Sequence, residues 1–394
     1  FGISSFSARL PNAVLSVIFP VILFNIGSRL KNKTFGWVWS IIFLSGLLPN
    51  LYFRTGIIDP YFNLFIFLSI YFFFLSINHN KVKNIFFSGL FSGLAILTKG
   101  PVGLLLVLLS CTIYSLSCRK KISLKNILIF ISTVIIVSSP WYIIELVNKG
   151  PWFLIEFIQY QIELFSKPVA GHQQPIYYHF VVLLFGCIPF SFFALRSIFI
   201  DSKSDLKFEK MMRICFWTVL VLFTIVTTKI VHYSSMAYVP LSFLGSIEIY
   251  KIINGKSFSK GIKLFLFLLS SIIATLLSFF IYLLIYQKGI IMSFSDNIQL
   301  KTLLNLNLLW QGWEWTIPLI IAFSSLLWII KFKFQPLKSL AIYSLLIGLS
   351  FSLISYFIIP KIEFAIQGTV VSFYKDISKE KKYLTTVGFK SYAP

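Results

Sequence analysis

The sequence predicts an all-α protein that crosses a membrane many times. Of its 394 residues, 57% are hydrophobic and only 12% are charged, and the mean hydropathy is +0.85. A soluble domain usually carries about twice that share of charged residues. Apolar runs of membrane-spanning length recur along the whole chain. Because backbone polar groups in hydrocarbon must be paired within the segment, we expect these runs to be helices.

Twelve apolar spans make up a predicted membrane domain, residues 1–359. They cover residues 11–28, 36–53, 60–77, 84–98, 102–118, 126–144, 176–196, 212–228, 234–250, 264–286, 315–331 and 339–358. Several spans are short for a hydrocarbon core of about 30 Å. Short spans bounded by polar turns favour broken or tilted helices around a cavity.

The basic residues predict the orientation in the membrane. The net charge of +22 comes from clusters in alternate connections between spans, such as Arg119, Lys120 and Lys121. Such clusters mark cytoplasmic connections and suit anionic lipid, so we do not expect a nucleic-acid partner. The four cysteines lie in or beside apolar runs without metal-type pairing, and we interpret them as inert buried thiols.

The last part of the chain changes character. Twelve spans return the chain to the external side, so residues 360–394 are predicted to be external. An amphipathic helix at Thr369–Ile377 is followed by a strand pattern at Tyr383–Val387. Together they predict the start of a soluble α/β domain.

The external connections hold isolated polar residues that orientation does not require. At membrane depth such groups cost several kcal/mol unless they face a cavity or a partner. YFRTGIIDP places Arg54 and Asp59 between two spans, as a salt-bridged turn or as one wall of an external cavity. In LTKGPVG, the Gly-Pro pair starts a new helix beside Lys99. That position favours an anion such as phosphate, unless Lys99 only snorkels to the interface.

Two further external segments contain candidate ligand contacts. In residues 138–168, aromatic side chains alternate with glutamates, as in a helix that lies in the membrane interface. The stretch GHQQPIYYHF follows it. Its candidate cavity residues are His172, Gln173, Tyr177 and Tyr178, of which the two tyrosines also suit an ordinary aromatic belt.

The stretch TKIVHYSS joins two apolar runs on the external side. Lys229 and His232 are three residues apart and would share a face of a helical turn. A cation beside a histidine is repelled unless an anion or a metal lies between them. We therefore assign Lys229 to phosphate binding, and His232 and Tyr233 to the substrate cavity. His232 is also a weak candidate metal ligand, so a divalent metal is left open and no other cofactor is predicted.

The order of these motifs resembles a known family. FSARLPNA, RTGIIDP, GLAILTKGPVGLLL, GHQQPIYYHF and TKIVHYSSMAYVPL follow one another along the chain. Together they resemble bacterial members of the protein O-mannosyltransferase/aminoarabinose (lipid A) transferase family, which are integral-membrane glycosyltransferases of the GT-C fold. The resemblance implies a polyprenyl-phosphate-linked sugar donor, a lipid A-type glycolipid or protein acceptor, and catalysis on the external (periplasmic) side of the bacterial inner membrane.

The resemblance also implies roles for individual residues. The family's principal catalytic carboxylate lies in the first external loop, which would precede Phe1, so Asp59 is expected to support catalysis. Lys99, Lys229 and Arg54 are expected to contact the donor phosphate. Two other functions stay open. A polysaccharide ligase or polymerase would share the donor, whereas a lipid or solute transporter would show mid-span charges and internal repeats.

Overall fold

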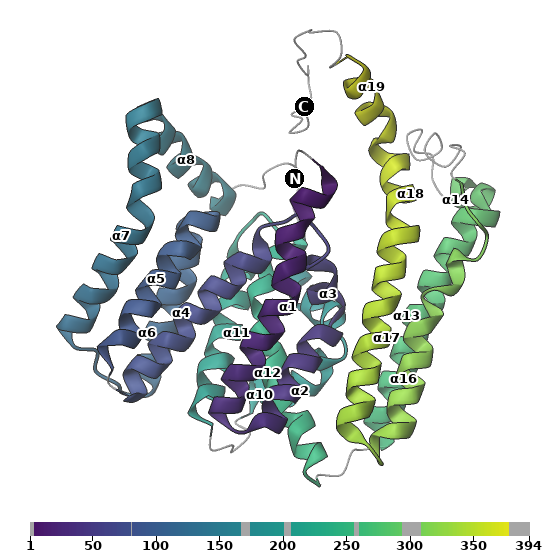
Figure 1. Ribbon diagram of the computed structural model, residues 1–394, viewed down its shortest axis with the longest axis horizontal. Helices are drawn as coiled ribbons and strands as arrows, with labels where there is room; N and C mark the ends of the chain where they lie inside the picture. The colour runs from purple at the N-terminus through teal and green to yellow at the C-terminus, as the bar shows by residue number, and fades with distance from the viewer. Residues whose placement is uncertain are drawn as a thin grey trace. The chain divides into compact units, whose positions relative to one another are not determined.

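The computed structural model describes residues 4–79, 81–166, 174–200, 206–255, 260–293 and 309–377, and within these ranges it is helical without a β-strand. The chain divides into two compact units, residues 1–258 and 259–394 (Figure 1). The boundary between the units falls inside the predicted membrane domain, residues 1–359. The predicted external segment, residues 360–394, is part of the second unit.

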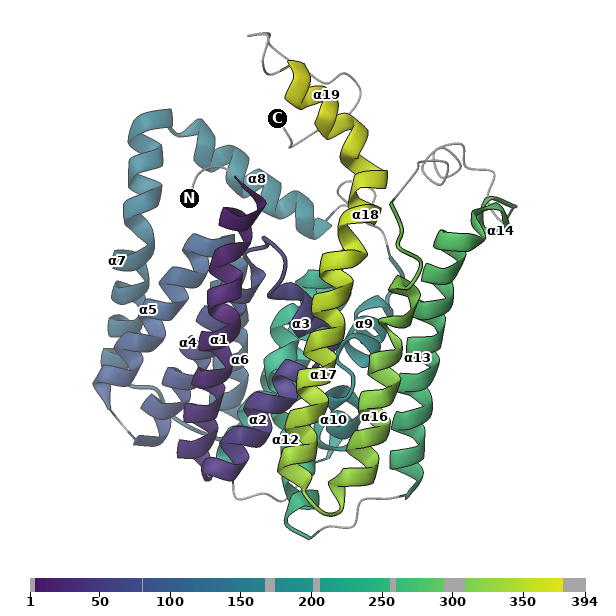
Figure 2. The same cartoon turned by 45° about the vertical axis from the view of Figure 1, so that its right-hand side comes forward.

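The first unit contains twelve α-helices and one 3-10 helix in its described ranges. They are α1 (Ser5–Leu30), α2 (Lys33–Ser45), α3 (Leu47–Tyr52), α4 (Asp59–His79), α5 (Val82–Lys99), α6 (Val102–Ser117), α7 (Leu124–Lys149), α8 (Trp152–Ser166), α9 (Tyr178–Gly186), α10 (Phe190–Phe199), α11 (Lys207–Ile225), the 3-10 helix η2 (Val231–Ala237) and α12 (Tyr238–Ile253). Figure 2 shows α8 turning sharply away from the end of α7.

The second unit consists of a smaller set of helices. They are α13 (Lys260–Tyr286), α14 (Lys288–Ser293), the 3-10 turn η3 (Glu314–Thr316), α16 (Leu319–Phe332), α17 (Pro336–Phe357), α18 (Ile359–Glu363), the π-helical turn η4 (Phe364–Gly368) and α19 (Thr369–Ile377). The predicted amphipathic helix is therefore present as α19. The predicted strand at residues 383–387 lies outside the described residues.

The predicted all-α membrane fold is confirmed. Each of the twelve apolar spans falls on one helix or on a pair of short helices. Among the described residues, seven helices are long and apolar enough to cross a membrane unaided. The span 36–53 is broken into α2 and α3 at Gly46, and the span 176–196 is broken into α9 and α10 just before Phe190. The two breaks pack closely against each other. A Cβ added at Gly46 would lie only 2.4 Å from Cε1 of Phe190, so the Phe190 ring sits directly against the glycine backbone.

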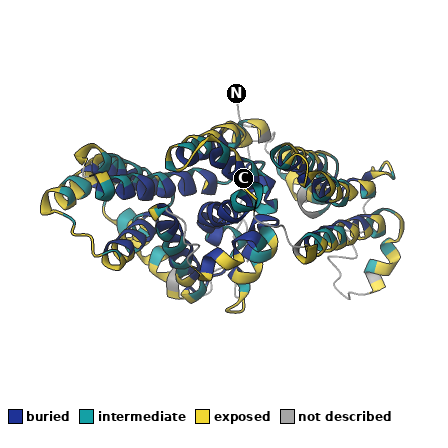
Figure 3. Ribbon diagram, turned by 90° about the horizontal axis from the view of Figure 1, so that it is seen from below, coloured by how far each residue is buried: buried dark blue, intermediate teal, exposed yellow. Residues whose placement is uncertain are grey.

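The core of the first unit surrounds α12, which packs against α2, α10 and α11. All but four of its residues are buried. Figure 3 shows the buried residues on the sides of helices that face other helices and the exposed residues on the outer sides. Trp39 of α2 is fully buried, and its indole N–H donates to Oγ of Ser242 on α12 at 3.1 Å. Such a hydrogen bond offsets the cost of burying the indole N–H. This core holds the helix ends that form the candidate site.

A buried ion pair fastens the loop before α16 in the second unit. The Glu314 side chain is fully buried. Its carboxylate accepts hydrogen bonds from the backbone N–H groups of Gln311 and Gly312, each at 2.9 Å. Lys361 of α18 donates a short hydrogen bond to the same carboxylate. Charge-assisted hydrogen bonds of this kind compensate for burial of the carboxylate. The pair thereby ties α18 to the start of α16.

Candidate active site

A cavity of about 820 Å³ opens in the first unit where several helices end. Its walls come from the first turns of α4, the α5–α6 turn, one face of α8, the end of α11, and η2. Most of the lining is apolar, including Phe157 and Phe223. A cavity of this size, largely apolar with a few convergent polar groups, is typical of a ligand site.

An ion pair between Asp59 and Lys99 lies in this cavity. Nζ of Lys99 is 2.7 Å from Oδ1 of Asp59. The aspartate side chain is 5% exposed and the lysine side chain 25% exposed. The two residues line the cavity together, although they come from different connections between the predicted spans. Asp59 therefore pairs with Lys99 rather than closing a turn with Arg54.

Local sequence places both members of the pair at helix ends. Asp59 is the first residue of α4 and is followed by Pro60, so its carboxylate lies at the positive end of the helix dipole. Lys99 lies in the last turn of α5, at the negative end of that dipole. The expected position at the start of the next helix is therefore corrected, since α6 begins only at Val102.

Gly100 shapes the turn that follows Lys99. Its φ is +84°, a left-handed conformation that residues with a Cβ rarely adopt. A Cβ at this position would also lie 3.0 Å from Cζ of Phe157 on α8. The glycine in LTKGPVG thus allows α8 to approach the turn and to form one wall of the cavity.

Aromatic rings surround the ammonium group of Lys99. Its Nζ lies 5.3 Å from the ring centre of Tyr233 and 5.7 Å from that of Phe62. A cation over an aromatic face is attracted by the ring quadrupole. The Tyr233 ring is in turn 5.6 Å from Phe223 and 5.2 Å from His232. The ammonium group of Lys99 thus lies between the carboxylate of Asp59 and the aromatic rings of the cavity.

The predicted interfacial helix forms the outer wall. α8 contributes apolar side chains and the polar groups of Tyr160, Gln161 and Ser166 to the cavity lining. Tyr160 is 47% exposed, so the phenol is accessible to a ligand. Alternation of aromatic and polar residues indicated the helix itself, but it did not indicate which side chains would face the cavity.

Comparison with known proteins supports the resemblance in the sequence. A family model described as dolichyl-phosphate-mannose-protein mannosyltransferase matches residues 1–144. The undecaprenyl phosphate-α-4-amino-4-deoxy-L-arabinose arabinosyl transferase of Wigglesworthia glossinidia brevipalpis is 26% identical over 300 residues, covering 73% of this chain and 52% of that protein. The transferase of the same name from Pectobacterium carotovorum is 24% identical, covering 62% of this chain and 45% of that protein. The chain thus spans about half the length of these relatives.

A solved structure decides the fold. ArnT from Cupriavidus metallidurans bound to undecaprenyl phosphate superimposes with a TM-score of 0.73 at 16% identity, covering 97% of this chain and 68% of that chain. The chain has the GT-C fold of this ArnT. The apo state of the same ArnT gives a TM-score of 0.72. The GT-C fold that the motifs implied is therefore confirmed.

Two of the three predicted phosphate-binding cations of this GT-C relative do not line the cavity. Lys229 is buried, and its Nζ donates to the backbone carbonyl of Val226 at 2.9 Å. The face shared with His232 does not form, because η2 begins only at Val231. Arg54 donates to the side-chain and backbone oxygens of Asn50. Burial lowers the pKa of Arg54 from its ordinary value, and the guanidinium remains charged at neutral pH.

The remaining candidate residues are dispersed. Tyr177 is 61% exposed just before α9, and neither it nor Tyr178 is among the residues that line the cavity. His179 is fully buried, and its Nδ1 lies 3.1 Å from Oγ of Ser234 in η2. This contact links α9 to the His232 segment. His172 and Gln173 lie outside the described residues.

The described residues do not form a metal centre. In the parts of the chain that the structure describes, no three His, Cys, Asp or Glu side chains are grouped so that they could hold an ion. His232 lines the cavity without such companions. A zinc site usually has three or four protein ligands of these types, and the described residues do not assemble such a set.

Proposed function

We propose that the chain is the membrane part of a glycosyltransferase whose donor is a polyprenyl-phosphate-linked sugar. The observation that carries this proposal is the ion pair of Asp59 and Lys99 in a largely apolar cavity. The names of the relatives support the donor class. The asymmetry of basic clusters supports a site on the external, periplasmic side.

Lys99 is the proposed contact for the donor phosphate. A polyprenyl-phosphate sugar is a phosphodiester with one negative charge, and transfer leaves a phosphate monoester with additional charge. A cation that meets this developing charge stabilises the transition state more than the ground state. An ammonium group has three N–H donors. Because one of them points to Asp59, the others are available to phosphate oxygens.

Asp59 is proposed as a positioning residue for Lys99. Its carboxylate is buried and fixed at the start of α4, so the 2.7 Å contact holds the ammonium group toward the cavity. A lysine has a long, flexible stem, and a fixed partner reduces the conformational freedom that it loses on binding. Asp59 is also close enough to orient an acceptor hydroxyl that enters beside Lys99.

The other walls suit the rest of a lipid-linked sugar. Tyr160, Gln161 and His232 offer groups that can hydrogen-bond sugar hydroxyls. The apolar side chains of α6 and α8 offer a surface to isoprenoid. The names of the relatives favour an aminopentose, whereas the description of the family model favours mannose. We therefore propose the donor class and an acceptor that is a glycolipid or a protein.

The test measures sugar transfer by the full-length protein in nanodiscs. Undecaprenyl-phosphate aminoarabinose and a polyprenyl-phosphate hexose are supplied separately, with lipid A-type glycolipid or envelope protein as acceptor. Mass spectrometry of the acceptor should show the added sugar with one of these donors. Transfer from a nucleotide sugar alone, or transport of the lipid without sugar transfer, would contradict the proposal.

A further inference from the structure

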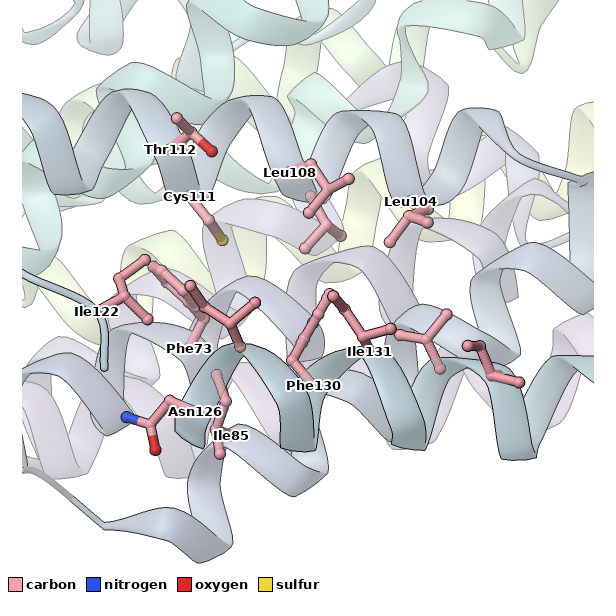
Figure 4. Close-up of a pocket in the computed structure, with 14 residues that line it drawn as sticks. Phe73, Ile85, Leu104, Leu108, Cys111, Thr112, Ile122, Asn126, Phe130 and Ile131 are labelled. Carbon is pink, nitrogen blue, oxygen red and sulfur yellow. The ribbon is translucent and has the colours of Figure 1, made fainter. Parts of the chain in front are cut away.

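A second cavity opens between α6 and α7, separate from the candidate active site (Figure 4). It has a volume of about 380 Å³, and no described residue lines both cavities. Figure 4 shows Leu104, Leu108 and Cys111 of α6 facing Phe130 and Ile131 of α7. Apart from Thr112 and Asn126, its lining side chains are apolar. We call it the α6–α7 crevice.

The packing of α7 leaves this crevice open. α7 packs against α5 rather than closing on α6. A Cβ at Gly89 of α5 would lie 2.8 Å from Cβ of Thr133, and a Cβ at Gly93 would lie 2.7 Å from Cβ of Val137. Small residues of this kind let membrane helices approach closely. Because this contact fixes α7 on α5, the side chains of α6 and α7 face each other across a gap.

One end of the crevice is polar and basic. It adjoins a second space of about 460 Å³, with Phe73, Ile85, Ile122 and Asn126 lining both. This second space adds the side chains of Lys121, Ser76 and Ser123.

Further positive charge surrounds this end of the crevice. The segment CRKKISLKN, residues 118–126, contains four basic residues and no acidic residue. Nζ of Lys210 also reaches this end and donates to the backbone carbonyl of Ser117 at 2.9 Å. The positive end of the α7 dipole begins here too, since Ser123 caps the helix.

We infer that the α6–α7 crevice binds an anionic phospholipid, with one acyl chain between the helices and the phosphate at Lys121. The apolar lining matches hydrocarbon, and the basic end matches an anionic head group. The positive-inside rule places this end at the cytoplasmic leaflet. The site is thus distinct from the proposed donor site in both position and ligand.

The length of the crevice favours a phospholipid over an isoprenoid. Its lining covers residues 126–135 of α7, which is about 14 Å at the helical rise of about 1.5 Å per residue. That is about half of a hydrocarbon core of about 30 Å. A crevice as deep as one leaflet suits the acyl chain of a phospholipid anchored at that leaflet, whereas the isoprenoid tail of a polyprenyl phosphate is much longer.

Native mass spectrometry of the full-length protein tests the inference. The protein is exchanged into detergent with phosphatidylglycerol or with phosphatidylcholine of identical acyl chains. Retention of phosphatidylglycerol should exceed that of phosphatidylcholine by about fivefold or more, the factor that one lysine near an anionic head group supplies. Equal retention of the two lipids, or retention of added polyprenyl phosphate in place of phosphatidylglycerol, would overturn the inference.

Matched variants locate the bound lipid. Leu108→Trp fills the crevice, whereas Leu116→Trp places the same ring on the 73% exposed side of α6. Lys121→Glu reverses the charge at the basic end, and Lys33→Glu does so at another exposed lysine. Only Leu108→Trp and Lys121→Glu should lower retention. Loss in either control to the same extent would contradict the assigned position.

A photoreactive lipid gives a readout that does not depend on variants. Phosphatidylglycerol with a diazirine in its acyl chain should label peptides that contain residues 104–112 and 127–135, which line the crevice. Labelling confined to other helices would overturn the inference, even if Leu108→Trp or Lys121→Glu failed to fold.

Discussion

Lys99 and Asp59 are 40 residues apart in the chain, yet Nζ of the lysine lies 2.7 Å from the carboxylate of the aspartate. The contact joins the end of α5 to the start of α4 inside a ligand-sized cavity. A pair of this kind has both a structural and a chemical consequence. It stabilises two helix ends, and it presents an ammonium group to whatever enters the cavity.

Removing the Lys99 charge should slow sugar transfer from the donor. Lys99→Ala is expected to lower the transfer rate about ten- to a hundredfold, since a charge-assisted hydrogen bond contributes about 1.5–3 kcal/mol. Lys99→Arg should restore part of the rate, because the charge persists with altered geometry. The measurement is initial transfer rate against donor concentration in nanodiscs.

Lys149→Ala is the matched control for this series. Its Nζ also lies 2.7 Å from a carboxylate, that of Glu145, but its side chain is 52% exposed and does not line the cavity. Exposed pairs contribute little, so its rate should stay within about twofold of wild type. A loss in Lys149→Ala equal to that in Lys99→Ala would remove the special role of Lys99.

Lys229 should prove less important for donor use than Lys99. Lys229 is buried, its ammonium group donates to the carbonyl of Val226, and Lys229 itself is not among the residues that line the cavity. Lys229→Met retains the length of the side chain and removes the charge, so donor KM should change by less than about threefold, a difference of about 0.7 kcal/mol. A tenfold rise in donor KM for Lys229→Met would instead support its original assignment to the phosphate.

Gly100→Ala should lower both stability and activity. The substitution strains a residue at φ +84° and places a Cβ 3.0 Å from Phe157. The backbone strain costs about 1–3 kcal/mol. Displacement of α8 should in addition lower the transfer rate. Gly255→Ala is the control, because its φ is +103° but nothing lies within 4 Å of the added Cβ. Both variants should lower the midpoint temperature of thermal unfolding, whereas only Gly100→Ala should lower the transfer rate. Full activity in Gly100→Ala would contradict the role of this turn.

Cysteine labelling should place the two cavities at opposite faces of the membrane. In a Cys118→Ser background, Lys149→Cys should react with an impermeant maleimide from the external side, and Lys121→Cys should react only after the membrane is opened. This expectation follows from the basic clusters, which mark the cytoplasmic connections. Only Cys118 needs to be replaced, because the other three cysteines are buried. The reverse labelling pattern would overturn the external position of the candidate site.

Apolar runs predicted nearly all helices because the bilayer permits few alternatives. Asp59 and Lys99 were also predicted to face a cavity, since isolated polar groups at span ends require a partner or a ligand, and both line the cavity of the first unit. Their mutual pairing was not predicted, because it depends on how α4 and α5 pack. The role of Lys229 was inferred from helical spacing, but residues 226–230 are not helical. The side of α8 that faces the cavity likewise depends on tertiary packing.

The proposed function requires that the phosphate of a polyprenyl-phosphate lipid binds at Lys99. A cryo-electron microscopy structure of the full-length protein with undecaprenyl phosphate tests it most directly. We predict phosphate density in the cavity, with an oxygen about 2.7–2.9 Å from Nζ of Lys99, the usual distance for a charge-assisted hydrogen bond. Phosphate density outside this cavity, with Lys99 still bound only to Asp59, would contradict the account.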